Sequence, residues 1–414
     1  MDRNVRWLGA SGAIRATGQS LVLPFIVLYL RNVLGIGYVE IGVLVALTGV
    51  APLLINPLAG LLTDRAGRRR VFLIALTIEA ASYLGLAVAM QARSLLEVFL
   101  LATEIQVVGA IAGPAISAYV ADFTQGSDRT LGFTWLRIGW NVGFTVGVLV
   151  GGSLIGLLGF VDVALAAGVV LLAGTAFVAA FLDPSPYDLA RVRSRRGSSE
   201  TSPRPRPGSI RQSLAVLARD RPFLAFCGAC AISQLTVGQW GTIFPLYVNS
   251  VLGIPYAILG AGLALNGLIV VFGQAPMTRA SLGRRHTLLY VLSIALYAAG
   301  FLLLGVVGQW SFHLVPAFFA VVFVLTLGEN FGSIPSTTLP SNLASPTEIG
   351  AYNGIFLAIL GVGQILAPVL GGVVLATSSS PLLVWSVLVA PVVPAGAILA
   401  LYVTPRLRAE ANTA

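Results

Sequence analysis

The stretch Gly60-Leu-Leu-Thr-Asp64-Arg65-Ala-Gly67-Arg68-Arg69-Arg70 separates two long apolar runs. A membrane crossing takes about 20 residues, so a stretch this short cannot recross a bilayer. It therefore predicts a tight polar hinge between two hydrophobic helices. Its glycines, Gly60 and Gly67, favour a sharp turn and a close approach of the helices. Arginines in a short loop between membrane helices favour the cytoplasmic side.

The composition is that of an integral membrane protein. Of the 414 residues, 57% are hydrophobic and only 10% are charged, whereas soluble domains carry about 25% charged residues. All 25 basic residues are arginine, which excludes a lysine Schiff base. The formal charge of +9 lies in short loops, a linker and the tails, so it is no basic face for nucleic acid. Cys227 and Cys230 lie in an apolar run without a second ligand pair, which favours packing over metal binding.

Apolar runs of spanning length predict the fold class, an all-α membrane protein. Twelve runs qualify: 8–32, 40–62, 71–91, 95–120, 131–157, 161–182, 222–250, 256–280, 286–307, 311–335, 348–377 and 381–404. The residues 183–221 between the two sets of six are rich in proline, serine and arginine, which predicts a largely disordered linker. We therefore expect an N-terminal six-helix bundle at 1–182 and a C-terminal one at 222–414.

The two halves repeat each other. Tyr29-Leu-Arg-Asn-Val-Leu-Gly-Ile-Gly-Tyr38 matches Tyr247-Val-Asn-Ser-Val-Leu-Gly-Ile-Pro-Tyr256. This match indicates two pseudo-symmetric bundles in parallel repeat. The arginines fall almost entirely on one side of the twelve runs, which predicts that both termini and the linker are cytoplasmic.

The hinge stretch resembles the signature loop of the major facilitator superfamily, G-x-L-x-D-R-x-G-R-R, which joins helices 2 and 3. The resemblance covers nearly the whole chain apart from the linker. It implies a conformational switch in which the loop aspartate is held near the cytoplasmic end of helix 11 and a loop arginine pairs with an acid at the end of helix 4. The residues that would carry this switch are Gly60, Asp64, Arg65, Gly67, Arg68 and Asp122.

A glycine ladder runs through the fifth apolar run. Its members, four residues apart, are Gly139, Gly143, Gly147 and Gly151. Small residues at this spacing line one helix face and allow another helix to come close. The run also resembles the helix 5 motif of the drug:proton antiporter branch, G-x-x-x-G-P-x-x-G-G, with Val148 in place of the proline. The alternative is a packing face of a kind common to many membrane proteins.

Charged side chains at bilayer depth cost about 2.5–3.5 kcal/mol on insertion scales, so they usually face the bundle interior or a wet cavity. In the superfamily, helices 1, 4, 7 and 10 line the central cavity. The candidates for proton coupling are Glu104, Glu329 and Glu79. The alternative for each acid is a buried salt bridge that fixes helix packing, with Arg15 or Arg137 as partner.

Further polar and aromatic groups indicate a substrate cavity. The candidates are Arg15, Gln106, Gln234, Trp240 and Asn330. Aromatic and aliphatic side chains mixed with a few amides suit amphipathic organic molecules better than sugars. The alternative is that most of these amides hold helices together.

These observations predict a secondary transporter and not an enzyme. It has no metal site and no cofactor, and it works by alternating access in the cell membrane of a prokaryote. Its partners are a small-molecule substrate, protons and the lipid bilayer, without nucleic acid, and the protein is a monomer. The resemblance favours proton-coupled efflux of small amphipathic or apolar compounds. The alternatives are a symporter or uniporter that imports a metabolite, and a membrane sensor that does not transport.

Overall fold

The computed structural model describes residues 2–189, 220–310, 312–345 and 348–413, apart from the side chains at positions 56, 57, 61, 64, 126, 127 and 130. The described part is helical, and its extended pairing is a single bridge between Arg285 and Thr413. The predicted fold class is confirmed.

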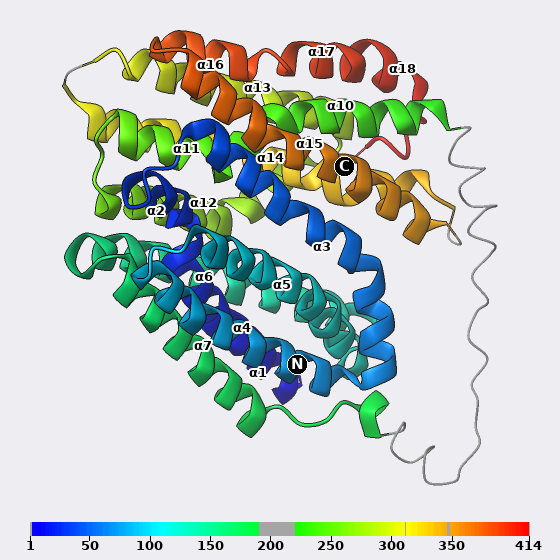
Figure 1. Cartoon of the computed structure of the whole chain (residues 1–414). Helices are drawn as coiled ribbons and strands as arrows, with labels where there is room; N and C mark the ends of the chain where they lie inside the picture. The colour runs from blue at the N-terminus through cyan, green and yellow to red at the C-terminus, as the bar shows by residue number, and fades with distance from the viewer. Residues whose placement is uncertain (1, 190–219, 311, 346–347, 414) are drawn as a thin grey trace. The chain divides into compact units, whose positions relative to one another are not determined.

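Six spanning helices come from the first half of the chain (Figure 1). They comprise α1 (Arg3–Val22) with η1 (Leu23–Phe25) and α2 (Ile26–Asn32), then α3 (Tyr38–Ala66), α4 (Arg68–Gln91), α5 (Leu95–Phe123), α6 (Gly126–Leu158) and α7 (Phe160–Phe181). The first span breaks at η1 because Pro24 has no N–H to continue the helix.

The second half supplies the other six. They comprise α10 (Arg221–Val237) with η2 (Gly238–Gly241), α11 (Ile243–Leu246) and η3 (Tyr247–Val251), then α12 (Tyr256–Ser281), α13 (His286–Val307), α14 (Leu314–Leu343), α15 (Ile349–Thr377), and finally α16 (Pro381–Val389), α17 (Val392–Ala397), η4 (Ile398–Val403) and α18 (Thr404–Arg406). The prediction of twelve spans is confirmed for the described residues.

The largest difference from the predicted bounds lies in α14, which continues to Leu343 instead of ending near residue 335. Hydrophobicity falls there, and both Pro335 and Pro340 lie inside the helix. The hydroxyl groups of this stretch bond within the helix, since Ser336 and Thr338 each donate to the carbonyl oxygen four residues earlier, at 2.8 Å. A prediction based on apolar residues alone ends the helix too early, because the last part of α14 is polar.

The repeat seen in the sequence extends to the backbone. Gly35 and Gly253, which occupy matching positions, have φ of 70° and 69°. This left-handed conformation suits glycine, which has no Cβ to clash. Each glycine lies in the short turn between the end of one span, at Asn32 or Val251, and the start of the next helix, at Tyr38 or Tyr256.

Contacts divide the chain into two compact units. One holds α1, α2, α4, α5, α6, α7 and most of α3, together with Pro255–Val271 from α12. The other holds the remaining helices of the second half, together with Ile36–Ala46 at the start of α3. The units therefore follow the two sequence halves except for these two segments.

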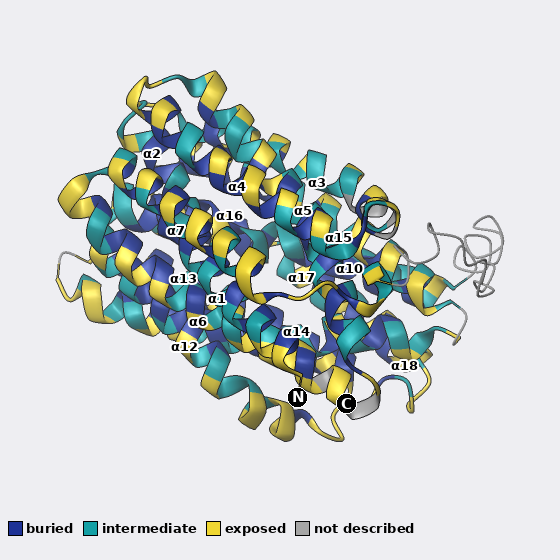
Figure 2. Ribbon diagram, turned by 90° about the horizontal axis from the view of Figure 1, so that it is seen from below, coloured by how far each residue is buried: buried dark blue, intermediate teal, exposed yellow. Residues whose placement is uncertain are grey.

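Each unit has its own apolar core. In the first, α4 packs against α5 and α7, and α1 packs against α6 and α7 (Figure 1). In the second, α13 packs against α14 and α16, and α10 packs against α15. Exposed residues recur along the helices (Figure 2). Large apolar ones are among them, for example Val88, Leu157 and Leu401. Exposed apolar side chains in such number are expected where lipid is the solvent.

The first residues of the predicted linker, 183–189, belong to the described part of the chain and contact the first unit. Residues 186–189 form a helical turn. Asp183 pairs with Arg3 at 2.9 Å and donates its backbone N–H to Asn4 Oδ1 at 3.1 Å. The guanidinium of Arg68 lies 4.4 Å from the ring centroid of Tyr187. These contacts attach 183–189 to the first unit, and the rest of the predicted linker, 190–219, lies outside the described residues.

Candidate functional site

The turn between α3 and α4 is made by one residue. α3 continues through Asp64 and Arg65 to Ala66, and α4 begins at Arg68. Gly67 between them has φ 96° and ψ 139°, and its N–H donates to Thr63 O at 3.1 Å. A side chain at this φ would be strained, so the turn depends on glycine. The end of the first unit that contains Gly67 is called here the hinge end.

Gly60 takes no part in this turn, which corrects the expectation that both glycines shape it. It lies inside α3, and a Cβ built on it would meet no described atom within 4 Å. Arg65 is exposed. The side chain of Asp64 lies outside the described residues, so its predicted contact with the eleventh spanning helix stays a prediction.

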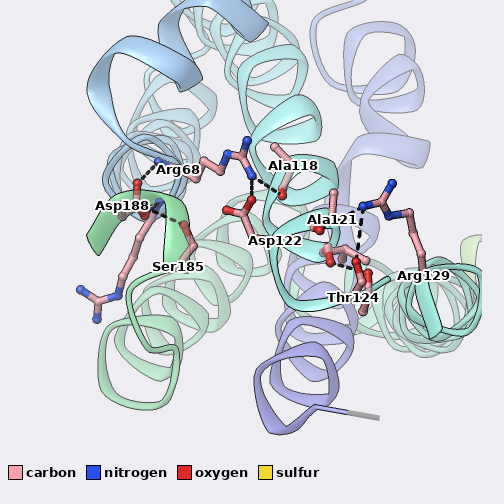
Figure 3. A network of polar contacts seen from close by, with 10 residues as sticks. Arg68, Ala118, Ala121, Asp122, Thr124, Arg129, Ser185 and Asp188 are labelled. Atoms are coloured by element: carbon pink, nitrogen blue, oxygen red, sulfur yellow. Dashed lines mark hydrogen bonds and ion pairs between the residues drawn. The ribbon is translucent and has the colours of Figure 1, made fainter. Parts of the chain in front are cut away.

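Arg68 and Asp122 form an ion pair at the hinge end (Figure 3). The side chains are 14% and 12% exposed. Arg68 Nη1 also donates to Ala118 O at 2.7 Å. The C-terminal end of a helix carries partial negative charge, so an arginine is favourable near it. The side chain of Arg68 therefore binds the end of α5 in two ways.

Two further arginines bind helix ends in the same manner. Arg129 donates to Ala121 O at 3.3 Å and to Thr124 O at 3.4 Å, again at the end of α5 (Figure 3). Arg69 donates to Ala179 O and Leu182 O, both at 2.7 Å, at the end of α7. The basic hinge thus ties the start of α4 to the ends of α5 and α7. It acts as a structural clamp.

A second charged cluster lies inside the first unit. Arg15 Nε on α1 is 2.7 Å from Glu79 Oε2 on α4, and Arg15 Nη2 is 3.3 Å from Glu79 Oε1. Gln19, one helical turn after Arg15, donates to the same carboxylate. The side chain of Glu79 is fully buried and that of Arg15 is 8% exposed. Three donors on one carboxylate match the buried salt bridge that was the alternative for Glu79.

Glu104 differs from Glu79 in its surroundings. Both Glu104 and Gln106 are exposed on α5. Among the described residues, the side chain of Glu104 has no hydrogen-bond or ion-pair partner and does not join the Arg15 cluster. At 1.5 Å per residue, Glu104 lies about 14 Å along the helix axis from Leu95. An ionised carboxylate at that depth needs water or a partner.

The third acid, Glu329, is half-buried on α14 and lies close enough to Tyr297 of α13 for an electrostatic interaction. Its neighbour Asn330 is 1% exposed. Asn330 Nδ2 donates to Thr326 O at 3.1 Å, whereas its Oδ1 is buried without a partner in the described part of the chain. Asn330 is thus held to its own helix and retains one unused acceptor.

The candidates on the seventh span are half-buried. Trp240 stacks on Phe244 with ring centroids 4.5 Å apart, and Gln234 contacts α15, since a Cβ on Gly363 would lie 2.8 Å from Gln234 Cβ. The amide of Gln239 donates to Ala367 O at 2.9 Å. This hydrogen bond joins the span to α15, which is the structural role that was the alternative for such amides.

The four glycines of the α6 ladder lie against α1. A Cβ built on Gly139, Gly143, Gly147 or Gly151 would overlap a main-chain carbonyl oxygen of α1, namely that of Gly9, Ala13, Thr17 or Leu21 in the same order. Each step of four residues along α6 matches a step of four residues along α1. The two helices therefore run parallel in close contact. Thr17 Oγ1 adds a hydrogen bond to Gly143 O at 3.2 Å. The ladder is a packing face.

Sequence reasoning missed Arg69, Arg129 and Gln19. Most of their acceptors are main-chain carbonyl oxygens, which every residue carries and which therefore leave no sequence signal. Gln19 had one usable signal, its position one turn after Arg15. No group of three or more His, Cys, Asp or Glu residues in the described part of the chain is placed to hold a metal ion.

Twelve apolar spans in two repeated halves, with buried ion pairs and a charged hinge, define a membrane transporter. The chain belongs to the major facilitator superfamily, whose family description matches residues 8–307. Members of this family are transporters and not enzymes. The chain is 23% identical over 393 residues to YttB, an MFS-type transporter of Bacillus subtilis (strain 168), covering 94% of this chain and 92% of that protein.

Two further comparisons bear on branch and fold. The chain is 33% identical to the class C tetracycline resistance protein of Escherichia coli over 141 residues, which are 34% of this chain and 35% of that protein. The crystal structure of the peptide transporter POT in complex with alafosfalin matches with a TM-score of 0.77 at 17% identity, covering 100% of this chain and 96% of that chain. At this identity the match shows the fold alone.

Proposed function

We propose that the chain exports small amphipathic or apolar organic compounds in exchange for protons, as a member of the drug:proton antiporter branch. The partial similarity to a tetracycline resistance protein supports this branch. Transport would proceed by alternating access, with the two bundles 1–182 and 222–414 as the moving parts. The protein would act as a monomer in a prokaryotic cell membrane with both termini cytoplasmic, since its short loops on that side carry the arginines.

The observation that carries the proton-coupling proposal is the contrast between Glu104 and Glu79. Three donors, two of them nitrogens of Arg15, hold the carboxylate of Glu79, which supports a structural role for this acid. The carboxylate of Glu104 is exposed and has no such donors among the described residues, which supports a role other than helix packing. We therefore assign proton transfer to Glu104, with Glu329 as a second carrier in the other half. Glu79 serves to hold Arg15.

The conformational switch is assigned to Asp64, Arg65 and Arg68, with Asp122 as the partner of Arg68 and Gly60 and Gly67 in the supporting backbone. The Arg68–Asp122 pair is largely shielded from water and ties α4 to α5. Such a clamp lets the hinge end of the first bundle move as one piece. The substrate cavity is assigned to Arg15, Gln106, Gln234, Trp240 and Asn330, of which Gln106, Gln234 and Trp240 are at least partly exposed.

The test uses everted membrane vesicles that contain the protein and a luminal pH indicator. After the lumen is acidified by respiration, tetracycline and ethidium are added as substrate probes. Antiport export predicts that the lumen becomes more alkaline when a transported probe is added, and that Glu104→Gln abolishes this response. Glu97→Gln is the matched control, because Glu97 is an exposed acid near the start of the same helix.

The alternatives give different results in the same vesicles. A symporter would carry protons with the probe and acidify the lumen, and a uniporter would accumulate no probe against its gradient. A sensor would bind the probe, as a thermal shift reports, without moving it. If Glu104→Gln behaved like Glu97→Gln in vesicles that do alkalinise, Glu104 would not be the proton carrier.

A further inference from the structure

In each half, the segment that follows the sixth span returns to the start of the third span. In the first half this segment is 183–189, after α7. Asp188 Oδ1 accepts from the N–H of Arg68 at 2.8 Å, and Asp188 Oδ2 accepts from the N–H of Arg69 at 3.1 Å (Figure 3). These are the first two amides of α4, which have no acceptor inside their own helix. A carboxylate is also favoured there by the positive end of the helix dipole.

In the second half the returning segment follows α18. The main-chain oxygen of Asn412 accepts from the N–H of His286 at 2.7 Å, and its Oδ1 accepts from the N–H of Thr287 at 3.0 Å. These are the first two amides of α13. The amide group of Asn412 also donates to Thr287 Oγ1 at 3.0 Å, and Asn412 is only 1% exposed.

The two capped positions are equivalent. Arg68 and His286 begin the third span of their halves, and their separation in sequence equals that of the matching residues Tyr29 and Tyr247. The two returning segments, in contrast, do not share a sequence pattern, and one cap is an aspartate while the other is an asparagine. In each half the same two amides are therefore capped by a residue of the returning segment, although the capping residues do not correspond in sequence, which argues that the capping itself matters.

The first cap is held in place from both sides. The N–H of Asp188 donates to Ser185 Oγ at 3.1 Å, and Ser185 is fully buried. Tyr187 lies over the guanidinium of Arg68, whose side chain continues to Asp122 on α5. Arg68 thus bonds to the returning segment through its backbone and to α5 through its side chain. A shift of Asp188 would move the residue that forms the switch ion pair.

We propose that Asp188 and Asn412 are positioning residues for transport, each of which fixes the first turn of the third span in its half. The proposal rests on the alternating access described above. In the first half, Asp188 holds the backbone from which Arg68 reaches Asp122, so the chain leading out of the first bundle moves together with the hinge. In the second half, Asn412 gives the equivalent turn the same support without a charge.

The test compares Asp188→Ala and Asn412→Ala in the full chain, purified in lipid nanodiscs. Hydrogen exchange of the amides is followed by mass spectrometry of peptides covering 63–72 and 284–291. Loss of a cap predicts exchange about 2- to 30-fold faster in the first turn of α4 for Asp188→Ala. Asn412→Ala keeps the main-chain oxygen that accepts from His286, so it should speed exchange in the first turn of α13 to a smaller extent, and each effect should be confined to its own half. Asp188→Asn, which keeps one acceptor oxygen, should give a smaller change than Asp188→Ala.

Matched controls are Asp128→Asn, an exposed acid in the first turn of α6, and Glu410→Ala, an exposed residue in the second returning segment. Neither should alter exchange at the two turns. Transport adds the functional readout, for which we expect a lower maximal rate with unchanged thermal shift by a bound probe. Exchange that stays unchanged at both turns would refute the contacts, and faster exchange with a normal maximal rate would refute the positioning role. The exchange result does not depend on which substrate or ion is moved, so it stands apart from the export proposal.

Discussion

Arg15 of α1 and Glu79 of α4 form an ion pair inside the first unit, with 2.7 Å between Arg15 Nε and Glu79 Oε2. Gln19 donates to the same carboxylate, and the hydroxyl of Tyr83, one turn beyond Glu79, donates to Gln19 O at 3.4 Å. The pair joins two helices that the sequence separates by a complete span. It also leaves the carboxylate of Glu79 with three donors.

The first prediction concerns this pair. Glu79→Gln leaves the charge of Arg15 buried without a counter-ion, which typically costs about 3–5 kcal/mol of stability. The double variant Arg15→Met/Glu79→Leu removes both charges and should recover most of that loss, because a buried pair often contributes little over apolar residues of similar volume. Thermal unfolding of each purified variant in the same detergent measures the effect. A double variant no more stable than Glu79→Gln would contradict the ion-pair account, and Glu97→Gln controls for loss of an exposed acid.

The second prediction concerns the glycine ladder. Gly143→Ala places a methyl group against the carbonyl oxygen of Ala13 and should cost about 1–3 kcal/mol, because α1 and α6 must move apart. Gly156→Ala, on the same helix, is the control. A Cβ there meets no described atom within 4 Å, so the change should be neutral or stabilising by up to about 1 kcal/mol. Equal unfolding temperatures for the two variants would argue against close packing at Gly143.

The third prediction separates the two glycines of the hinge stretch. Gly67→Ala forces a side chain into a positive φ and should cost about 1–3 kcal/mol. Gly60→Ala lies within α3 and should not reduce stability, since alanine is the better helix former. Protein yield and unfolding temperature report the difference. If Gly67→Ala were as stable as Gly60→Ala, the positive φ would not be the reason for a glycine at position 67.

The fourth prediction distinguishes two neighbouring arginines. Arg69 donates to two carbonyl oxygens at the end of α7, and hydrogen bonds from a charged group contribute about 1.5–3 kcal/mol, so Arg69→Ala should lower the unfolding temperature. Arg70 is exposed, and Arg70→Ala should change stability by less than about 0.5 kcal/mol. A purely topological role for these arginines predicts instead that both variants are equally stable.

Much of the fold could be predicted from the sequence. The twelve spans follow from local hydrophobicity, because lipid requires a continuous apolar helix at each crossing. The predicted helix ends were less accurate where a polar stretch stays helical, as it does around Pro335 and Pro340 in α14. That the glycine ladder of α6 packs against α1 could not be predicted. The glycines contact main-chain oxygens of α1, and every residue type carries such an oxygen.

The candidate site was only partly predictable. Arg68 and Asp122 lie together as the family resemblance implied, whereas the partner of Glu79 was left open between Arg15 and Arg137. Spacing along one helix says which residues share a face, but not which face of another helix meets it. That choice requires the packing of α1 against α4.

The sequence by itself determined that this protein crosses the membrane twelve times in two repeated halves, because apolar length and repeat are properties of the chain alone. Only the tertiary structure decided which charges are paired and which helix starts are capped. Asp188 and Asn412 are far in sequence from the amides they bind. Contacts of this kind form only when the helices have packed and the segments after α7 and α18 lie next to the starts of α4 and α13. A local sequence pattern does not contain this information.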